Sequence, residues 1–85
     1  MQEIRKFLEE GKLVLGSKVV IKKLRSKELE KIYISRNCKK ETEQDITKLA
    51  KLGSIEIIKV EMTNEELGTY CRKPFHISIV GLLKG

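Results

Sequence analysis

Apolar residues follow two periods along the chain, and stretches of the two kinds alternate. Ile4, Phe7 and Leu8 fall on one face of a helix expected over residues 2–10, and Gly11 follows where a glycine commonly ends a helix. The same helical period predicts further helices over residues 18–25, 42–53 and 63–70. Short runs rich in β-branched residues predict strands over residues 12–15, 32–34, 55–60 and 75–83.

Local patterns mark where the helices begin and end. Ser17 follows Gly16 in a turn, where its side chain can cap the second helix. Thr63 and Glu66 have the spacing of a capping box, in which each side chain satisfies the backbone N–H group of the other residue. Pro74 ends the last helix, because the residue before a proline avoids helical backbone angles. No linker, repeat or low-complexity segment separates the elements.

Helices and strands therefore alternate four times within 85 residues, a length that suits one small domain. This order predicts an α/β fold, a three-layer α/β/α sandwich with a four-stranded mixed sheet. We expect residues 1–85 to form this single domain.

The charge of the chain narrows the choice of partners. Lysine and arginine number 18 against 12 aspartates and glutamates, which gives a formal net charge of +6. Such an excess favours polyanions, and nucleic acid is the commonest of these for a basic domain. The charge alone does not separate RNA from DNA or from an acidic protein.

The composition also argues against several classes of protein. Apolar runs of four or five residues are too short to span a membrane, and residues 1–7 lack the apolar stretch of a secretory signal. Cys38 and Cys71 are far apart, and His76 is the only histidine. We therefore expect reduced thiols, a cytoplasmic protein and no metal site.

Patterns typical of catalysis are absent from the sequence. There is no nucleophile elbow, no phosphate-binding glycine loop and no cysteine–histidine pair close in sequence. Glu41, Glu43 and Asp45 belong to the first turn of a predicted helix, where they complement the helix dipole and need no catalytic role. We expect a binding module without cofactor or small-molecule substrate, and not an enzyme.

The predicted second helix carries a stripe of positive charge. Its apolar face holds Val20, Ile21 and Leu24, and its opposite face holds Lys18, Lys22 and Arg25. Most charge runs are solvated surface, but no acidic residue balances these cations before Glu28, and phosphate contact requires a stripe of one sign. The helix also begins at Gly16 and Ser17, where free backbone N–H groups favour an anion.

The segment before the last strand combines cations with an aromatic residue. Arg72 and Lys73 precede Phe75, and an exposed ring in a loop can stack on any base while the cations hold phosphate. The alternative is that Phe75 is the first core residue of its strand, which strict alternation with Ile77 favours. His76 fits a partly exposed strand position better than a catalytic one.

The loop after the second strand is the third polar connection. Arg36 and Asn37 open it, and an asparagine can hydrogen-bond base edges or, more often in a turn, its own backbone. All three connections are expected on the same rim of the sheet, where open α/β folds tend to bind ligands. Their convergence predicts a binding site at that rim.

Taken in order, these motifs resemble the L-thirty-e family of large-subunit ribosomal proteins, within the ribosomal kink-turn-binding superfamily. The resemblance is carried by GKLVLGS at residues 11–17, Lys22, IYISRNC at residues 32–38, and ELGTYCRKPF at residues 66–75. It covers nearly the whole chain, and the first and last blocks together are fairly specific.

The resemblance implies an α/β/α sandwich that binds a kink-turn or a similar internal loop of ribosomal RNA. By position, Gly16, Ser17 and Lys18 would lie against the kinked backbone, and Lys22 would reach the sheared G·A pairs. Arg36 and Asn37 would contact the RNA next. The loop containing Arg72 and Lys73 would close over an extruded nucleotide, on which Phe75 would stack.

The chain departs from the family pattern at two places. Many relatives carry an asparagine–glutamate pair where this chain has Lys18 and Val19, and valine accepts no hydrogen bond from guanine. The usual glycine before Lys73 is Arg72 here.

The resemblance further implies a protein that is monomeric when free and has ribosomal RNA and other ribosomal proteins as partners in the cytoplasm. Two alternatives remain open at this point. One is a seven-Ae-type protein of guide ribonucleoprotein particles or ribonuclease P. The other is a stand-alone accessory domain of an RNA-modifying enzyme.

Overall fold

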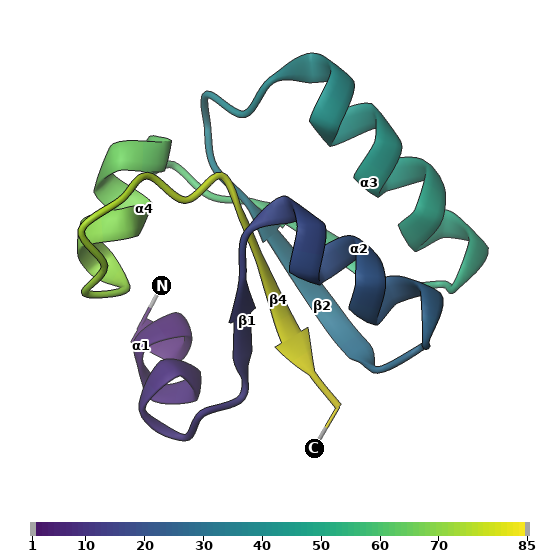
Figure 1. The fold of residues 1–85 in the computed structure, drawn as a ribbon, viewed down its shortest axis with the longest axis horizontal. Coiled ribbons are helices and arrows are strands. Elements are labelled where there is room, and N and C mark those ends of the chain that lie inside the picture. Colours follow the sequence, from purple (N-terminus) through teal and green to yellow (C-terminus); the bar gives the residue numbers. More distant parts are fainter. Residues whose placement is uncertain (1, 85) are drawn as a thin grey trace.

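The structure is a computed structural model that describes residues 2–84, and within this range four helices alternate with four strands (Figure 1). The helices are α1 (Gln2–Glu9), α2 (Ser17–Arg25), α3 (Lys40–Leu52) and α4 (Asn64–Tyr70). The strands are β1 (Leu13–Leu15), β2 (Leu29–Ile34), β3 (Glu56–Lys59) and β4 (Ile79–Leu83). The predicted element order is confirmed.

The four strands form one mixed sheet in the order β1-β4-β2-β3. Strand β4 is antiparallel to both β1 and β2, whereas β2 and β3 are parallel. Strands β1, β2 and β3 therefore run in one direction, and their C-terminal ends reach the same rim of the sheet. Helices α2, α3 and α4 each begin close behind this rim, because each follows one of these three strands.

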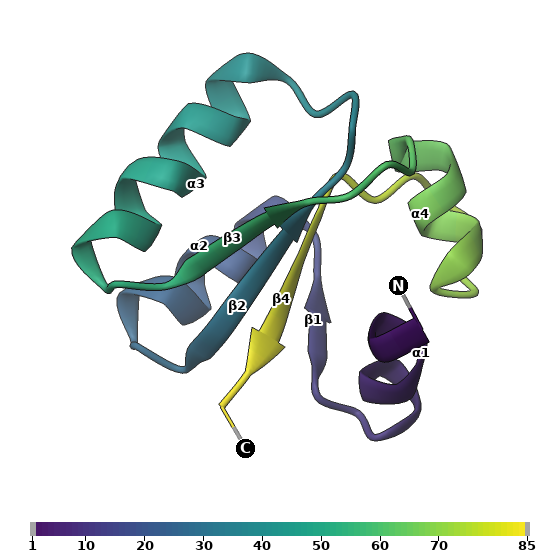
Figure 2. The ribbon, with the colours of Figure 1, turned by 180° about the vertical axis from the view of Figure 1, so that it is seen from behind.

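Helices cover both faces of the sheet, as Figures 1 and 2 show from opposite sides. Strand β2 divides the core between them, because Ile32 and Ile34 point to one face and Tyr33 to the other. On the first face, Val20 and Leu24 of α2 and the apolar residues of α3 complete a cluster. On the second face, α1 and α4 do the same. The predicted three-layer α/β/α sandwich is confirmed.

Several predicted boundaries agree with the backbone geometry. Gly11 follows α1 with φ +70°, a left-handed conformation that favours glycine. Thr63 and Glu66 form the expected capping box at the start of α4. Gly53 caps the end of α3. Two elements begin earlier than predicted: α3 at Lys40 in place of residue 42, and β2 at Leu29 in place of residue 32.

Two further local predictions were wrong. Ser17 does not cap α2: it is the first residue of the helix, Gly16 stands at the cap position with φ +97°, and no side chain caps the helix. The last strand begins at Ile79 and not at residue 75. Its neighbours end there, since Leu15 pairs with Val80 and Ile34 pairs with Ile79. The segment before Ile79 runs past the end of both strands and forms a loop.

Among the described residues, none of the helices has the length and apolar character needed to cross a membrane.

Candidate nucleic-acid interface

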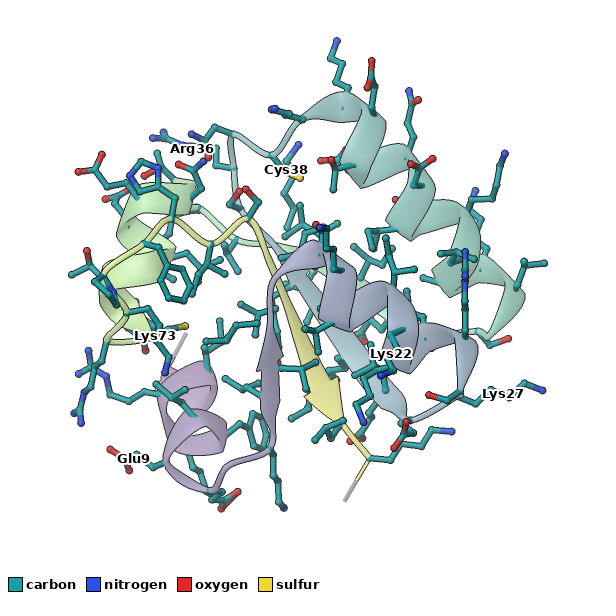
Figure 3. All side chains as sticks on the ribbon, viewed as in Figure 1. Glu9, Lys22, Lys27, Arg36, Cys38 and Lys73 are labelled. Carbon is teal, nitrogen blue, oxygen red and sulfur yellow. The ribbon has the colours of Figure 1, made fainter. Side chains whose placement is uncertain are left out.

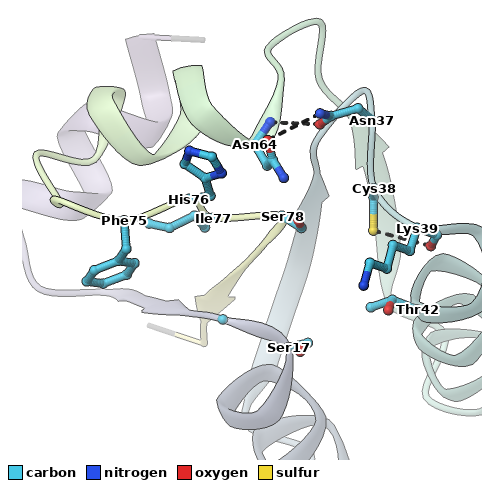
Figure 4. Close-up of a pocket in the computed structure, with 11 residues that line it drawn as sticks. Ser17, Asn37, Cys38, Lys39, Thr42, Asn64, Phe75, His76, Ile77 and Ser78 are labelled. Carbon is cyan, nitrogen blue, oxygen red and sulfur yellow. Dashed lines mark hydrogen bonds between the residues drawn. The ribbon is translucent and has the colours of Figure 1, made fainter.

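Three connections meet at the rim where β1, β2 and β3 end, and a pocket of about 410 Å³ lies between them (Figure 4). The connections are the β1–α2 turn, the β2–α3 loop and the α4–β4 loop. The pocket is lined by Gly16, Ser17, Asn37, Cys38, Lys39, Thr42, Asn64, Phe75, His76, Ile77 and Ser78. The three connections singled out from the sequence therefore do lie together.

The β1–α2 turn contributes an open helix N-terminus. The N–H group of Gly16 donates to the carbonyl of Ile79 at 3.0 Å, which anchors the turn to the start of β4. Val20 makes the first backbone bond of the helix, donating to the carbonyl of Gly16 at 3.0 Å. Because no side chain caps α2, the amides of its first turn keep the positive end of the helix dipole available to an anion.

The cationic stripe of α2 is exposed, as predicted. Lys18, Lys22 and Arg25 all lie in solvent, whereas Val20 and Leu24 are buried on the opposite face. These three cations do not line the pocket. They extend from its edge along the helix, and Lys22 points outward from α2 in Figure 3. At 1.5 Å per residue, Lys22 lies about 7.5 Å along the axis from Ser17.

The two predicted residues of the β2–α3 loop have different surroundings: the Arg36 side chain is free of the loop contacts that hold Asn37. The side chain of Arg36 is exposed at the top of the rim (Figure 3), while its backbone N–H donates to the carbonyl of Met62 at 2.8 Å. The side chain of Asn37 is bound to Asn64 of α4. The asparagine therefore serves a backbone 27 residues away, and not its own turn.

Phe75 lies outside the core, with 55% of its surface exposed. The neighbouring Ile77 is 1% exposed, so the core position expected from alternation holds for Ile77 and fails for Phe75. Gly68 explains how the loop is held, because a Cβ atom on this glycine would overlap the carbonyl oxygen of Phe75. The loop before β4 thus lies directly against the backbone of α4, and the ring of Phe75 lines the pocket.

Arg72 and Lys73 form the turn that follows α4. Arg72 adopts φ +61°, the left-handed conformation in which the family pattern has glycine. The amides of both residues close the helix end, on the carbonyls of Thr69 and Gly68 respectively. Both side chains are exposed, and Lys73 lines a smaller hollow of about 240 Å³ together with Phe75. Neither side chain lines the larger pocket.

Sequence reasoning missed several residues of the pocket wall, of which Asn64 is the most firmly bonded to its surroundings. Lys39, Thr42 and Ser78 also line the pocket. Nothing in the local sequence singles out Asn64, because its partner Asn37 is 27 positions away. The one available indication was its place directly after the capping residue Thr63, which brings it to the start of α4.

Burial disfavours the thiolate form of both cysteines. Burial raises the pKa of the Cys38 thiol, and the nearby Glu43 carboxylate raises it further, against the opposing effect of Lys59. Burial likewise raises the pKa of the Cys71 thiol. Both cysteines are free, and no group of three potential metal ligands occurs among the described residues.

The fold and the rim define a class: a basic α/β/α sandwich with an open helix N-terminus, an exposed ring and exposed cations along one edge. The family model of the Ribosomal protein L7Ae/L30e/S12e/Gadd45 family matches residues 1–84. The chain belongs to this family.

Relatives agree with this assignment, and a solved structure agrees with the fold. The large ribosomal subunit protein eL30 of Sulfurisphaera tokodaii is 33% identical over 81 residues, covering 95% of this chain and 76% of the relative. The eL30 protein of Methanocaldococcus jannaschii is 35% identical over 80 residues, covering 94% and 73%. The structure of the Giardia lamblia 15.5kD RNA binding protein has a TM-score of 0.81 at 11% identity, covering 96% of this chain and 68% of that one, which supports the fold.

These relatives confirm the resemblance to the L-thirty-e type. They are named large ribosomal subunit proteins, and the family is non-enzymatic, so the expectation that the chain is not an enzyme is confirmed at the level of the family.

Proposed function

We propose that this protein binds ribosomal RNA in the large ribosomal subunit and recognises a kinked internal loop there. The observation that carries the proposal is the meeting of three connections around one pocket, with the ring of Phe75 exposed at its edge. The relatives named large ribosomal subunit protein eL30 support the assignment to the large ribosomal subunit.

Each part of the rim suits one part of such an RNA. The uncapped start of α2 favours a phosphate group of the backbone, and Lys18, Lys22 and Arg25 continue the positive surface along the helix. The pocket beside Phe75 has room for a base that has left the helical stack, and aromatic stacking tolerates any base. Arg36, Arg72 and Lys73 would then neutralise the phosphates that flank the loop.

A kinked loop fits this rim better than a plain duplex. The exposed cations belong to separate parts of the surface: Lys18, Lys22 and Arg25 lie on α2, Arg36 in the β2–α3 loop, and Arg72 and Lys73 in the turn after α4. RNA that bends sharply can bring backbone from both of its arms to such a surface. A regular A-form duplex offers neither the bend nor an unstacked base.

Val19 sets an expectation about affinity. Its side chain is 42% exposed beside the helix start and supplies no hydrogen-bond acceptor. This protein should therefore bind a kink-turn less tightly than relatives that carry glutamate at the same position. We further propose that the free protein is a monomer and that it acts in the cytoplasm, on the ribosome, beside other ribosomal proteins.

The test is a pair of gel-shift titrations at one stated salt concentration. One RNA carries a kink-turn. The other is a fully paired duplex of the same length and with a nucleotide composition as similar as full pairing permits. The proposal expects clearly tighter binding of the kinked RNA. Equal affinity for the two RNAs would reduce the protein to a general binder of polyanions and contradict the proposal.

A further inference from the structure

Asn64, the first residue of α4, lies where two of the three connections meet (Figure 4). Its backbone N–H donates to Oδ1 of Asn37 at 2.8 Å, and its own Oδ1 accepts from Nδ2 of Asn37 at 3.2 Å. Its backbone carbonyl accepts from the N–H of Ile77 at 3.0 Å. One residue is thus bound to the β2–α3 loop by two bonds and to the α4–β4 loop by a third.

These bonds join two irregular segments, which are also linked by a bond from the N–H of Ser35 to the carbonyl of Ser78 at 2.8 Å. Asn37 belongs to the irregular loop between β2 and α3, and Ile77 to the segment that precedes β4. Helix α4 therefore contributes to the position of both segments. The second segment also rests on α4 at Gly68, which touches the backbone of Phe75. Helix α4 acts as a common support for the residues on two sides of the pocket.

An asparagine pair is suited to this task because each amide is both a donor and an acceptor. The two bonds fix the orientation of the Asn37 side chain before any ligand arrives. Loops that are already held in the bound geometry lose less conformational entropy on binding, and affinity rises accordingly. This arrangement gives Asn37 a role besides the RNA contact that the resemblance implies.

We propose that Asn64 is a positioning residue, which holds the β2–α3 loop and the Phe75 loop in register for RNA. This inference rests on the proposed function, because the register matters only to a ligand that contacts both loops. Its contacts with the side-chain amide of Asn37 hold the β2–α3 loop. Its backbone carbonyl, which accepts from Ile77, holds the Phe75 loop.

The experiment is a double-mutant cycle with Asn64→Ala, Asn37→Ala and the double variant. Each is titrated with the kinked RNA and with the duplex, after its folding has been verified by denaturant unfolding. Gln44→Ala is the matched control, since it removes an amide side chain from α3 that does not line the pocket.

Asn64→Ala should weaken binding of the kinked RNA about three- to tenfold, the size expected for one lost hydrogen bond, and leave duplex binding unchanged. The ratio of the two affinities is informative, because a general loss of folded protein would lower both equally. Asn37→Ala should weaken kinked-RNA binding more, since it removes both bonds. The double variant should bind like Asn37→Ala alone, because Asn64 then has no side-chain partner left to lose.

Three results would overturn the inference. One is wild-type affinity of Asn64→Ala, and another is simple additivity of the two single losses. The third is a loss that is confined to one base identity in the RNA loop, because Asn64 would then be reading that base directly.

A second measurement separates this inference from the proposed function. Should the wild-type protein fail to prefer the kinked RNA, amide hydrogen exchange on the free protein still tests the connection between the loops. Asn37→Ala should speed exchange at Asn64, which loses its acceptor, and also at Ile77, whose own acceptor is untouched. Unchanged exchange at Ile77 would show that the Asn37–Asn64 pair does not couple the two loops and would overturn the inference.

Discussion

At the scale of single residues, the exposed ring of Phe75 depends on a glycine seven positions earlier. Gly68 lets the backbone of the loop approach α4 so closely that any side chain would collide with the carbonyl of Phe75. The chain therefore turns before it enters β4, and Ile77 becomes the first buried residue after the turn. Phe75 therefore lies at the edge of the pocket. A large apolar ring exposed to water at such a place is typical of a binding site, and its flat face suits a stacked base.

Phe75→Ala should separate binding from folding. Folding stability should change by only about 0.5 kcal/mol, because the ring is mostly exposed. Binding of the kinked RNA should weaken by about 1–3 kcal/mol if the ring stacks on a base. Denaturant unfolding and RNA titration measure the two effects.

The matched control is Ile77→Ala, which should cost about 2–5 kcal/mol of folding stability because its side chain is 1% exposed. A large loss of stability for Phe75→Ala, with unchanged affinity of the protein that remains folded, would contradict the stacking role.

Arg72→Gly should stabilise the protein and weaken RNA binding. Arg72 holds a left-handed backbone at φ +61°, which disfavours any residue with a Cβ atom. Glycine relieves this strain, and we expect a gain of about 0.5–1 kcal/mol in the free energy of unfolding. Removal of the cation should lower RNA affinity and make its salt dependence shallower by roughly one unit. Unaltered stability would show that the turn carries no strain.

At the scale of elements, α2 and α4 begin at the same rim, but their N-termini differ: side chains cap α4 and none caps α2. Helix α4 has a complete capping box, and its first amides are partly satisfied within the protein. Helix α2 has glycine at its cap position and no side-chain cap. Its uncapped amides face the pocket beside Gly16 and Ser17, so the open end belongs to the proposed RNA site and the closed end to the scaffold.

Lys22→Glu tests the outer face of α2. Lys22 is exposed, so thermal stability should stay nearly unchanged. RNA affinity should fall by about tenfold or more, and the salt slope should become shallower by roughly one unit for each phosphate that the side chain no longer neutralises. Lys48→Glu makes the same change of charge on the exposed side of α3 and should weaken binding far less. Equal effects of the two variants would mean that only the net charge matters.

The capping box of α4 predicts a pH dependence of stability. The Glu66 carboxylate accepts from the backbone N–H of Thr63 at 2.9 Å, and this bond, with the Thr63 side chain, lowers the pKa of Glu66 below its usual 4.5. A lowered pKa in the folded state stabilises the protein above the unfolded pKa, and this contribution is lost as the pH falls through the lowered value.

Glu66→Gln should therefore remove part of the loss of stability that the wild type shows below about pH 4.5. Denaturant unfolding across this acid range measures it, with Glu65→Gln as the control at the neighbouring position. Parallel pH profiles of wild type and Glu66→Gln would contradict the role given to the capping box.

At the scale of the whole molecule, the sequence predicts that the three connections share one rim, but it does not predict the strand order or the contacts between the connections. Alternation of helices with strands predicts that successive strands end at one edge, and the turn at Gly16, the loop at Arg36 and the segment at Phe75 do meet there. The strand order is not accessible in the same way, because the last strand inserts between β1 and β2. Nor is the bond between Asn37 and Asn64, which joins residues 27 positions apart.

Local rules fail where the tertiary structure decides. Alternation predicts a strand from Phe75 onward, but no neighbouring strand extends far enough to pair with it. A serine after glycine predicts a cap at Ser17, but the helix begins one residue earlier than that rule requires. Both departures lie at the proposed RNA site. At that site, the exposed ring of Phe75 and the uncapped amides of α2 would serve a ligand and not the fold.

RNA binding at the rim is tested most directly by mapping amide chemical shifts while the kinked RNA is added to the protein. We predict that the largest changes fall on residues 16–18, 36–39 and 72–78, with smaller ones along the outer face of α2. The far end of α3, around Lys51, and the edge strand β3 should change little. Changes centred on α3 and β3, with the rim unaffected, would contradict the assignment of RNA binding to the three connections.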